Sequence, residues 1–210
     1  MSNHANRYEN NNPGLLANIY DAIDDFFYNT RKGKVIYKIL VFAISVFSIW
    51  LSIWLTSKYN NYQEKLEVIR MLNQLVTFQN EGIEKNASQY ERYSDDRYRT
   101  VTDCVSLSVY REVINNQKVR NFLDETAYAN IHHFLDIAEY TEGYIYSENA
   151  TSEGKIQAIK ARDYTASEIN ELILASSSAL ENKTDHDTLC ANIHDIINKY
   201  ADGFMDFPAY

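Results

Sequence analysis

The chain contains few of the residues that end helices. Its 210 residues include two prolines and six glycines. No proline lies between Pro13 and Pro208, and residues 58–210 hold four of the glycines. Because proline and glycine are the strongest terminators of helices, this scarcity predicts long helices.

Sequence motifs of catalysis are also missing. The chain has no Gly-x-Ser-x-Gly, no glycine-rich phosphate loop and no His-Glu-x-x-His, which are recurrent arrangements of nucleophiles, phosphate sites and metal ligands. The serine run within residues 175–180 falls in a helical pattern, and the acidic residues are scattered as on a solvated surface. We therefore expect a protein that is not an enzyme, with no catalytic residues and no cofactor.

Positive charge is scarce and unevenly placed. The formal net charge of the chain is −9, and residues 57–210 alone carry a net charge of −10. A nucleic-acid-binding surface needs basic side chains that contact phosphates. The charge balance therefore argues against nucleic acid as a partner.

Cysteine is limited to Cys104 and Cys190. If this part of the chain lies in an oxidising compartment, the two residues can form one disulfide. A loop of this length would stabilise the fold by about 4 kcal/mol in the chain-entropy model. Two free, buried thiols are the alternative.

A metal site is the other use that the sequence suggests for Cys190. His186, Cys190 and His194 follow one another at four-residue intervals, and imidazole and thiolate are zinc ligands. Three residues on successive helical turns do not readily converge on one ion. We therefore predict no metal site from these residues.

One long stretch of the chain carries no charge. Between Lys38 and Lys58 the sequence reads ILVFAISVFSIWLSIWLTS. The 18 residues Ile39–Thr56 would form a helix of roughly 27 Å at about 1.5 Å per residue, close to the ~30 Å core of a bilayer. A secretory signal would have a shorter apolar region, nearer the N-terminus and followed by a cleavage site. A core helix would have a charged face. The stretch therefore predicts a transmembrane helix over residues 35–57.

Basic residues flank this helix unequally. Four of them lie within eight positions on its N-terminal side, at Arg31, Lys32, Lys34 and Lys38. Those on the other side are spread over a longer segment. Because Lys and Arg near a span favour the cytoplasmic side, we expect a single-pass protein with a cytoplasmic N-terminus. Residues 58–210 would then form a periplasmic, extracytoplasmic domain.

A row of small hydroxyl side chains runs along the predicted span. The row, which we call the hydroxyl stripe, consists of Ser45, Ser48, Ser52 and Thr56, and Lys38 and Val41 extend it. At helical spacing the four hydroxyl residues fall within an arc of about 80°. Small residues let helices approach closely, and hydroxyls can bond across the interface. The stripe predicts packing between copies of the chain or a face toward a lumen, although each hydroxyl could instead bond to its own helix.

The segment before the span divides into two parts. Residues 1–12 are polar and without periodicity, which predicts a disordered tail. Residues 13–34 predict a cytoplasmic amphipathic helix followed by the basic juxtamembrane residues, with Asn12 as the N-cap and Pro13 at the first helical position. The apolar face of this helix could lie on the membrane surface. Its acidic polar face fits packing against another helix at least as well.

The C-terminal domain reads as mainly helical. Apolar residues recur at helical spacing in four segments, at residues 66–78, 119–137, 169–180 and 189–200. The first segment has no breaker before it, so it can continue the transmembrane helix up to Gly82. Gly203 is a plausible terminator of the last helix.

Two local patterns refine this reading of the domain. Residues 165–168 (TASE) match a capping box and predict a helix that starts there. Residues 102–110 (TDCVSLSVY) alternate apolar and polar side chains, which is typical of a strand. The expected fold class is therefore one N-terminal-proximal transmembrane helix and a mainly helical, possibly α+β, extracytoplasmic domain.

The stretch LLANIYDAIDDFFYNTRKGKV, followed directly by the apolar run, resembles the N-terminal region of the class III, single-span holins of T-even-type phages. Those proteins share a short amphipathic segment, a Gly-Lys-Val step such as Gly33-Lys34-Val35, one span and a large periplasmic domain. The likeness covers roughly residues 14–57 and the overall topology. The family's periplasmic domain is mixed α/β, whereas this one reads as mainly helical, so no regulator-binding residues are carried over.

The resemblance implies a function in phage lysis of the host cell. Such a holin accumulates in the inner membrane of the host, forms a homo-oligomer in the lipid bilayer, and opens lesions that release the endolysin. It also implies an antiholin-like regulator on the exported side as a possible partner. The alternative from the same layout is a membrane-anchored binding or scaffold protein, for example in superinfection exclusion or envelope assembly, whose span is only a tether.

Overall fold

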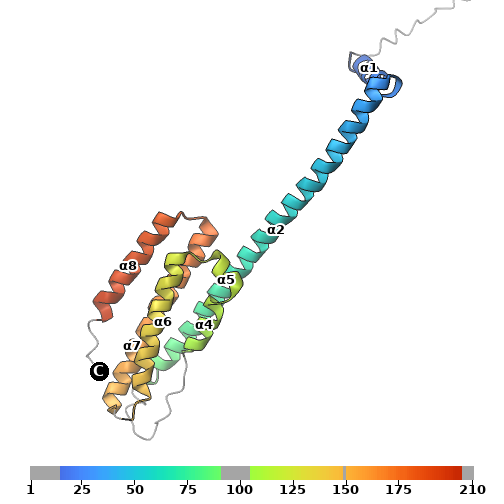
Figure 1. The fold of residues 1–210 in the computed structure, drawn as a ribbon. Helices are drawn as coiled ribbons and strands as arrows, with labels where there is room; N and C mark the ends of the chain where they lie inside the picture. Colours follow the sequence, from blue (N-terminus) through green and yellow to red (C-terminus); the bar gives the residue numbers. More distant parts are fainter. Residues whose placement is uncertain (1–14, 91–104, 149, 205–210) are drawn as a thin grey trace, which may run out of the picture. The chain divides into compact units, whose positions relative to one another are not determined.

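The computed structural model describes residues 15–90, 105–148 and 150–204. These residues form helices and no strand. The helices are α1 (Leu15–Asn29), α2 (Arg31–Ala87), α4 (Leu107–Ile114), α5 (Gln117–Phe122), α6 (Glu125–Ile145), α7 (Ser152–Asn182) and α8 (His186–Phe204) (Figure 1). The chain divides into two units at Asn60. The mainly helical prediction is confirmed.

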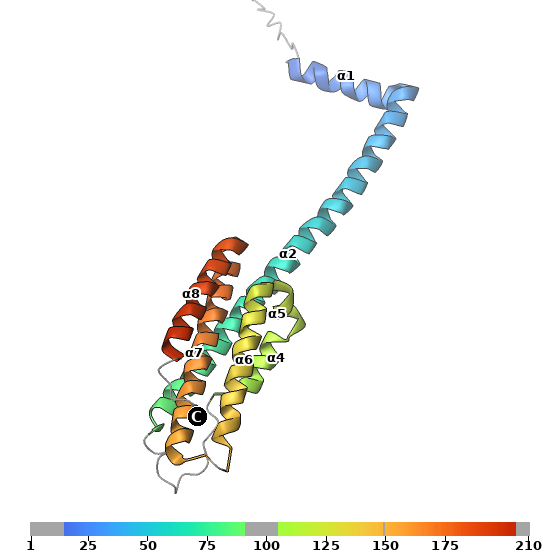
Figure 2. The same ribbon diagram turned by 60° about the vertical axis from the view of Figure 1, so that its left-hand side comes forward.

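The first unit contains α1 and the apolar part of α2. Thr30 separates the two helices and caps the second one: its hydroxyl donates to the Phe26 carbonyl at 2.7 Å and accepts from the Gly33 amide at 2.9 Å. A Cβ atom at position 33 would overlap the Phe26 carbonyl. Glycine therefore allows the close turn at Thr30, where the chain changes direction in Figure 2. Residues 1–12, predicted as a tail, lie outside the described residues.

Helix α2 is 57 residues long and passes through Gly82 without a break. The continuity that the lack of breakers predicts is found, but the expected end at Gly82 is wrong. A glycine inside a helix costs only about 1 kcal/mol relative to alanine. On either side of it, the buried side chains of Gln79 and Asn86 form hydrogen bonds with the rest of the second unit, which offset that cost.

The second unit is a helical bundle to which the C-terminal part of α2 contributes one buried face. Helices α6 and α7 pack along each other, and α8 packs on α7 (Figures 1 and 2). Its core is mainly aliphatic and includes the buried aromatic residues Tyr110, Phe134 and Tyr200. The largest fully buried apolar side chains include Leu72, Tyr110, Ile131, Leu135, Ile169, Leu172 and Ile173. The unit has about 150 residues, enough for an independent core.

Three side-chain hydrogen bonds join α2 to α7. They run from Ser177 to Asn73 at 3.0 Å, from Asn170 to Asn80 at 2.7 Å, and from Asn86 to Asp163 at 3.0 Å. From one bond to the next, the residue number in α2 increases by seven and then six, while the residue number in α7 decreases by seven each time. This spacing is the mark of two antiparallel helices that pair along one seam.

The strand expected over residues 102–110 is wrong for the part that the structure describes. Helix α4 begins at Leu107, and the Ser106 side chain caps it by accepting from the Val109 amide. Gln79 of α2 holds this cap with two hydrogen bonds to the Ser106 backbone, at 2.8 and 3.1 Å. In α4, Leu107, Tyr110 and Ile114 are buried on one side. A short apolar run is compatible with both a helix and a strand. Here the contact with Gln79 and the burial of one face favour the helix.

The helix start predicted at residues 165–168 is also wrong. Helix α7 begins at Ser152, and Thr151 caps it by accepting from the Gly154 amide at 3.1 Å. Thr165 lies in the middle of α7, where its hydroxyl donates to the Ala161 carbonyl at 2.9 Å. Thr165 and Glu168 match a capping box by spacing, but they are buried polar residues inside the helix.

Two further boundaries differ from the predictions. The segment 119–137 is not one helix, because α5 ends at Phe122 and Asp124 caps the start of α6. Gly203 is the penultimate residue of α8 and has no positive φ. A Cβ atom there would overlap the Tyr164 hydroxyl, so the glycine serves close packing and not helix termination.

Candidate functional site

The apolar part of α2 is exposed along its length. Its side chains are not covered by any other described part of the chain, and none of the most apolar 18-residue window is buried. Phe42 is 72% and Ile53 is 65% exposed. A core helix of a soluble protein would be mostly buried. The first unit thus contains one helix that is long and apolar enough to cross a membrane.

The hydroxyl stripe is present on this helix, and two of its side chains form hydrogen bonds with the backbone of the same helix. Ser45 donates to the Val41 carbonyl and Ser48 to the Ile44 carbonyl, each at 2.8 Å. For these two residues, the alternative in which each hydroxyl bonds to its own helix is therefore correct. Ser52 and Thr56 are exposed as well. For Ser45 and Ser48, small size is the property that the stripe offers to a neighbouring helix.

The basic residues expected to set the topology lie at the start of α2. Arg31, Lys32, Lys34 and Lys38 are all exposed. They occupy the first turns of the same helix that continues into the apolar segment. That these residues lie on the cytoplasmic side of a membrane stays a prediction.

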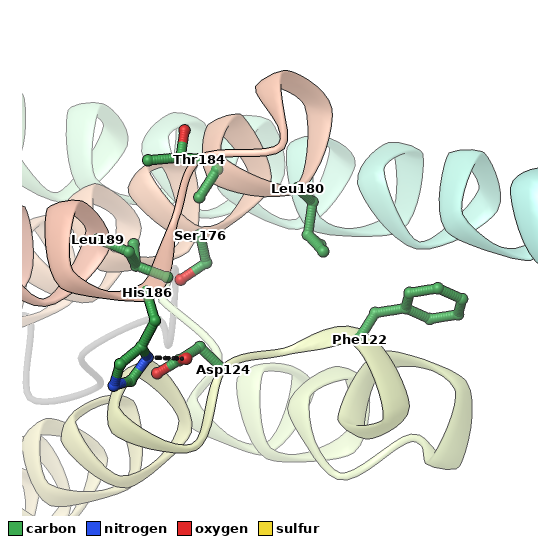
Figure 3. Close-up of a pocket in the computed structure, with 8 residues that line it drawn as sticks. Phe122, Asp124, Ser176, Leu180, Thr184, His186 and Leu189 are labelled. Carbon is green, nitrogen blue, oxygen red and sulfur yellow. Dashed lines mark hydrogen bonds and ion pairs between the residues drawn. The ribbon is translucent and has the colours of Figure 1, made fainter.

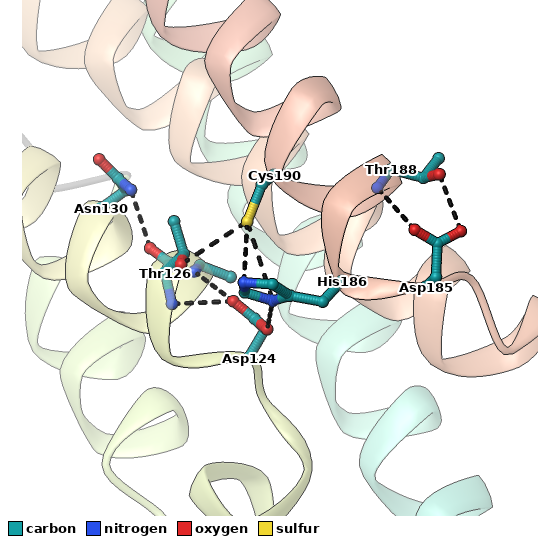
Figure 4. A network of polar contacts seen from close by, with 8 residues as sticks. Asp124, Thr126, Asn130, Asp185, His186, Thr188 and Cys190 are labelled. Atoms are coloured by element: carbon teal, nitrogen blue, oxygen red, sulfur yellow. Dashed lines mark hydrogen bonds and ion pairs between the residues drawn. The ribbon is translucent and has the colours of Figure 1, made fainter.

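The second unit contains a cluster of three side chains with metal-binding chemistry. Asp124, His186 and Cys190 each place one ligand atom within 4.8 Å of the other two (Figure 4). His186 Nδ1 lies 2.7 Å from Asp124 Oδ2, and Cys190 Sγ lies 3.8 Å from the same nitrogen. The sequence names two of these residues but pairs them with His194, which is not in the cluster. Asp124 carries no sequence signal beyond its place before a helix.

The charges of this cluster support one another. A hydrogen bond from His186 and bonds from the amides of Thr126 and Ala127 outweigh partial burial and lower the pKa of Asp124. The carboxylate in turn raises the pKa of His186. The pair resembles an exposed salt bridge, since the His186 side chain is 62% exposed.

A pocket of about 240 Å³ opens beside the cluster (Figure 3). Asp124 and His186 line it together with apolar side chains such as Phe122, Leu180 and Leu189. The pocket gives the carboxylate and the imidazole access to a small molecule or ion.

The predicted disulfide involves a residue outside the described part of the chain. Cys104 is not described, and Cys190 is partly buried in α8 beside the His186 ring. The pairing stays a prediction.

No family model, no curated protein and no solved structure matches this chain. The functional argument therefore depends on the residues themselves: the exposed apolar helix of the first unit, and the cluster and pocket of the second.

A buried polar network near the middle of α7 is structural. Arg162 is fully buried, with Nη1 3.0 Å from Glu142. Its neighbour Asp163 accepts from Asn86 and, at 2.8 Å, from Tyr90. Burying charges is costly unless they are paired and hydrogen-bonded. Because Glu142 lies in α6 and Asn86 lies in α2, these contacts fix how α2, α6 and α7 pack.

Proposed function

We propose that this chain is a holin-type protein that assembles in the inner membrane of a bacterial host and opens lesions at lysis. The observation that carries the proposal is the charge-free, exposed apolar segment of α2 with its hydroxyl stripe. The resemblance of residues 14–57 to single-span holins supports it. In this account α2 crosses the bilayer, and the acidic second unit is the extracytoplasmic domain.

Assembly would proceed through the stripe. A hydrogen bond between membrane helices contributes only about 0.6 kcal/mol on average, and the Ser45 and Ser48 hydroxyls already bond to their own helix. Close backbone approach is then the main source of attraction, because small side chains let more atoms of two helices come into contact. A weak contact repeated in every copy favours a large assembly once the protein is dense in the membrane.

A second candidate is an anchored binding protein. The pocket beside Asp124 and His186 favours it, since a folded domain with a pocket can bind a partner while the span serves as a tether. The two functions differ in what they require of α2. A holin needs a particular face of the helix, whereas a tether needs only length and hydrophobicity.

The decisive experiment expresses the full chain in bacteria with a cytoplasmic endolysin and follows culture density. The stripe variant changes Ser45, Ser48, Ser52 and Thr56 to leucine. The matched control changes four residues on the other side of the helix to leucine, namely Ile39, Ala43, Val46 and Phe47. Both variants remain apolar and equally long. Immunoblots of the membrane fraction verify equal amounts of protein.

We expect the wild-type chain and the control to cause abrupt lysis that depends on the endolysin, and the stripe variant to delay or abolish it. If the wild-type chain accumulates in the membrane without ever releasing the endolysin, the holin function is wrong. Equal lysis by both variants would reject the stripe as the assembly face.

A further inference from the structure

We propose that Asp124, His186 and Cys190 form a binding site for a divalent cation of the zinc class. The site lies between the start of α6 and the start of α8 in the second unit (Figure 4). It is independent of the holin proposal, since it uses no residue of α1 or of the apolar segment. Its consequence is that a bound metal would fasten α8 to the rest of the bundle.

The spacing of the ligand atoms fits one small ion. The Cys190 sulfur lies 3.8 Å from His186 Nδ1 and 3.4 Å from His186 Nε2, so the exposed imidazole must turn for one nitrogen to face an ion shared with the sulfur. Bond lengths of about 2.3 Å to sulfur and about 2.0–2.1 Å to nitrogen place two tetrahedral ligands roughly 3.6 Å apart. The distance of 2.7 Å from Nδ1 to Asp124 Oδ2 is a hydrogen bond. It needs to widen by several tenths of an ångström, which the exposed His186 side chain permits.

Each ligand is held by the local fold. His186 and Cys190 are four residues apart in α8, a spacing that places both on one face of a helix. Asp124 is the N-cap of α6, and its Oδ1 accepts from the amides of Thr126 and Ala127 at 2.8 and 3.4 Å. The cap fixes the carboxylate and directs its second oxygen toward the imidazole. Capping thus supplies the outer hydrogen bonds that orient a ligating carboxylate.

The chemistry of the three ligands selects the class of metal. A thiolate and an imidazole are ligands of zinc and related transition metals, whereas magnesium and calcium prefer oxygen. Three protein ligands leave the fourth tetrahedral position open, as in zinc sites that keep a water or another small ligand. The adjoining pocket and the exposure of His186 leave room for that ligand.

The test uses the full-length chain in detergent, with Cys104→Ser so that Cys190 cannot pair with it and position 104 cannot supply a thiolate. After removal of metal under reducing conditions, the protein is titrated with Zn²⁺, and bound metal is counted by elemental analysis. Co²⁺ is then used as a spectroscopic probe. We expect one equivalent of either metal and a thiolate-to-cobalt charge-transfer absorption.

Single substitutions assign the ligands. Cys190→Ser is expected to abolish the charge-transfer absorption. His186→Gln and Asp124→Asn are each expected to weaken Zn²⁺ binding by at least the roughly 10-fold that loss of an outer-shell partner costs. Asparagine is also a good N-cap, so the second change keeps the helix start. His194→Gln, one turn further along α8 and outside the cluster, is the matched control and should leave binding unchanged.

Three results would overturn the proposal. The first is no stoichiometric Zn²⁺ binding by the folded Cys104→Ser protein. The second is a charge-transfer absorption that survives Cys190→Ser. The third is a wild-type protein that, isolated without reductant, contains the Cys104–Cys190 disulfide and no metal. Circular dichroism of each variant verifies that the helices are intact, so loss of binding cannot be confused with loss of the fold.

Discussion

The side chain of Asn170 in α7 donates a hydrogen bond of 2.7 Å to the side-chain oxygen of Asn80 in α2. Its own oxygen accepts from the Tyr110 hydroxyl of α4, whose burial raises the tyrosine pKa. Asn170 is 3% exposed. One buried amide thus connects three helices, and only one register of α2 against α7 satisfies it.

Replacing this amide should destabilise the second unit. We expect Asn170→Leu to lower the free energy of unfolding by about 1–3 kcal/mol, because it removes two hydrogen bonds of the buried amide, to Asn80 and to Tyr110, and a typical hydrogen bond contributes about 0.5–1.5 kcal/mol. Tyr110 would keep its bond to the Ala166 carbonyl. Denaturant unfolding of the full-length protein in detergent, followed by helical ellipticity, measures the loss.

A double-mutant cycle with Asn80→Leu isolates the pair. Asn80→Leu alone leaves the Nδ2 group of the buried Asn170 without this acceptor, so this change should also cost about 1–3 kcal/mol. Removing both amides should cost less than the sum of the two single changes, since neither partner is then left unsatisfied. Strict additivity would show that the two side chains do not depend on each other.

The apolar segment and most helices are predictable from the sequence because each depends on local information. Residues 39–57 carry no charge, and the long α2 and the last helix follow from the helical spacing of apolar residues and the lack of proline and glycine. Helix ends are less predictable. Glycine often ends a helix, yet Gly82 and Gly203 both lie inside helices. The hydrogen bond from Asn86 to Asp163 holds α2 beyond Gly82, and at position 203 a Cβ atom would overlap Tyr164.

The polar contacts between distant residues could not be predicted. Asn80 and Asn170 are 90 positions apart, and the sequence contains no sign of which asparagine faces which. For the same reason Asp124 is missed as the neighbour of His186, 62 residues away. The sequence supplies candidate ligands on α8, but the loop that completes the cluster is placed by the fold.

Two glycines should respond in opposite ways to alanine. Gly143 lies in α6, and a Cβ atom there would meet nothing within 4 Å. Gly143→Ala should therefore stabilise the protein by about 0.5–1 kcal/mol, because alanine loses less backbone entropy in a helix. At Gly203 the added methyl group would overlap the Tyr164 hydroxyl, and Gly203→Ala should destabilise it by roughly 1–3 kcal/mol.

Thermal unfolding distinguishes these two outcomes. A change of 1 kcal/mol corresponds to about 2–4 °C in Tm for a domain of this size. The pair controls for the general effect of a glycine-to-alanine change in a helix. Stabilisation at both positions would mean that Tyr164 moves aside at no cost, and would remove close packing as the reason for a glycine at position 203.

Glu168 should make stability depend on pH. The residue is 2% exposed, and among the described residues it forms a salt bridge with Lys199 at 3.9 Å. Burial, with a further contribution from Glu171, raises the pKa of Glu168 above its ordinary value of 4.5, against the opposing effect of Lys199. Because the folded pKa is raised, the stability that the neutral carboxyl provides is present at low pH. It is lost as the pH rises through the folded pKa.

Glu168→Gln, which cannot ionise, should therefore raise Tm at pH 7 by about 2–4 °C. The gain should shrink as the pH falls and vanish below about pH 4.5, where the wild-type carboxyl is neutral in both states. Glu171→Gln is the matched control, since this exposed neighbour also contacts Lys199 and should cost at most about 1 kcal/mol. A gain for Glu168→Gln that is constant with pH would contradict the ionisation argument.

The hydroxyl stripe finally allows size to be separated from hydrogen bonding. Because Ser45 and Ser48 already donate to Val41 and Ile44, their replacement by alanine removes no bond between copies and preserves small side chains. The Ser45→Ala, Ser48→Ala protein should self-associate in lipid as strongly as the wild-type chain. The corresponding leucine double variant should associate more weakly, because the larger side chains keep helix backbones apart. Energy transfer between labelled copies in vesicles, measured over a range of protein-to-lipid ratios, compares the three proteins. If the alanine variant also dissociates, the hydroxyls must turn from their own carbonyls to a neighbouring helix on assembly, and hydrogen bonding would replace close approach as the attractive force.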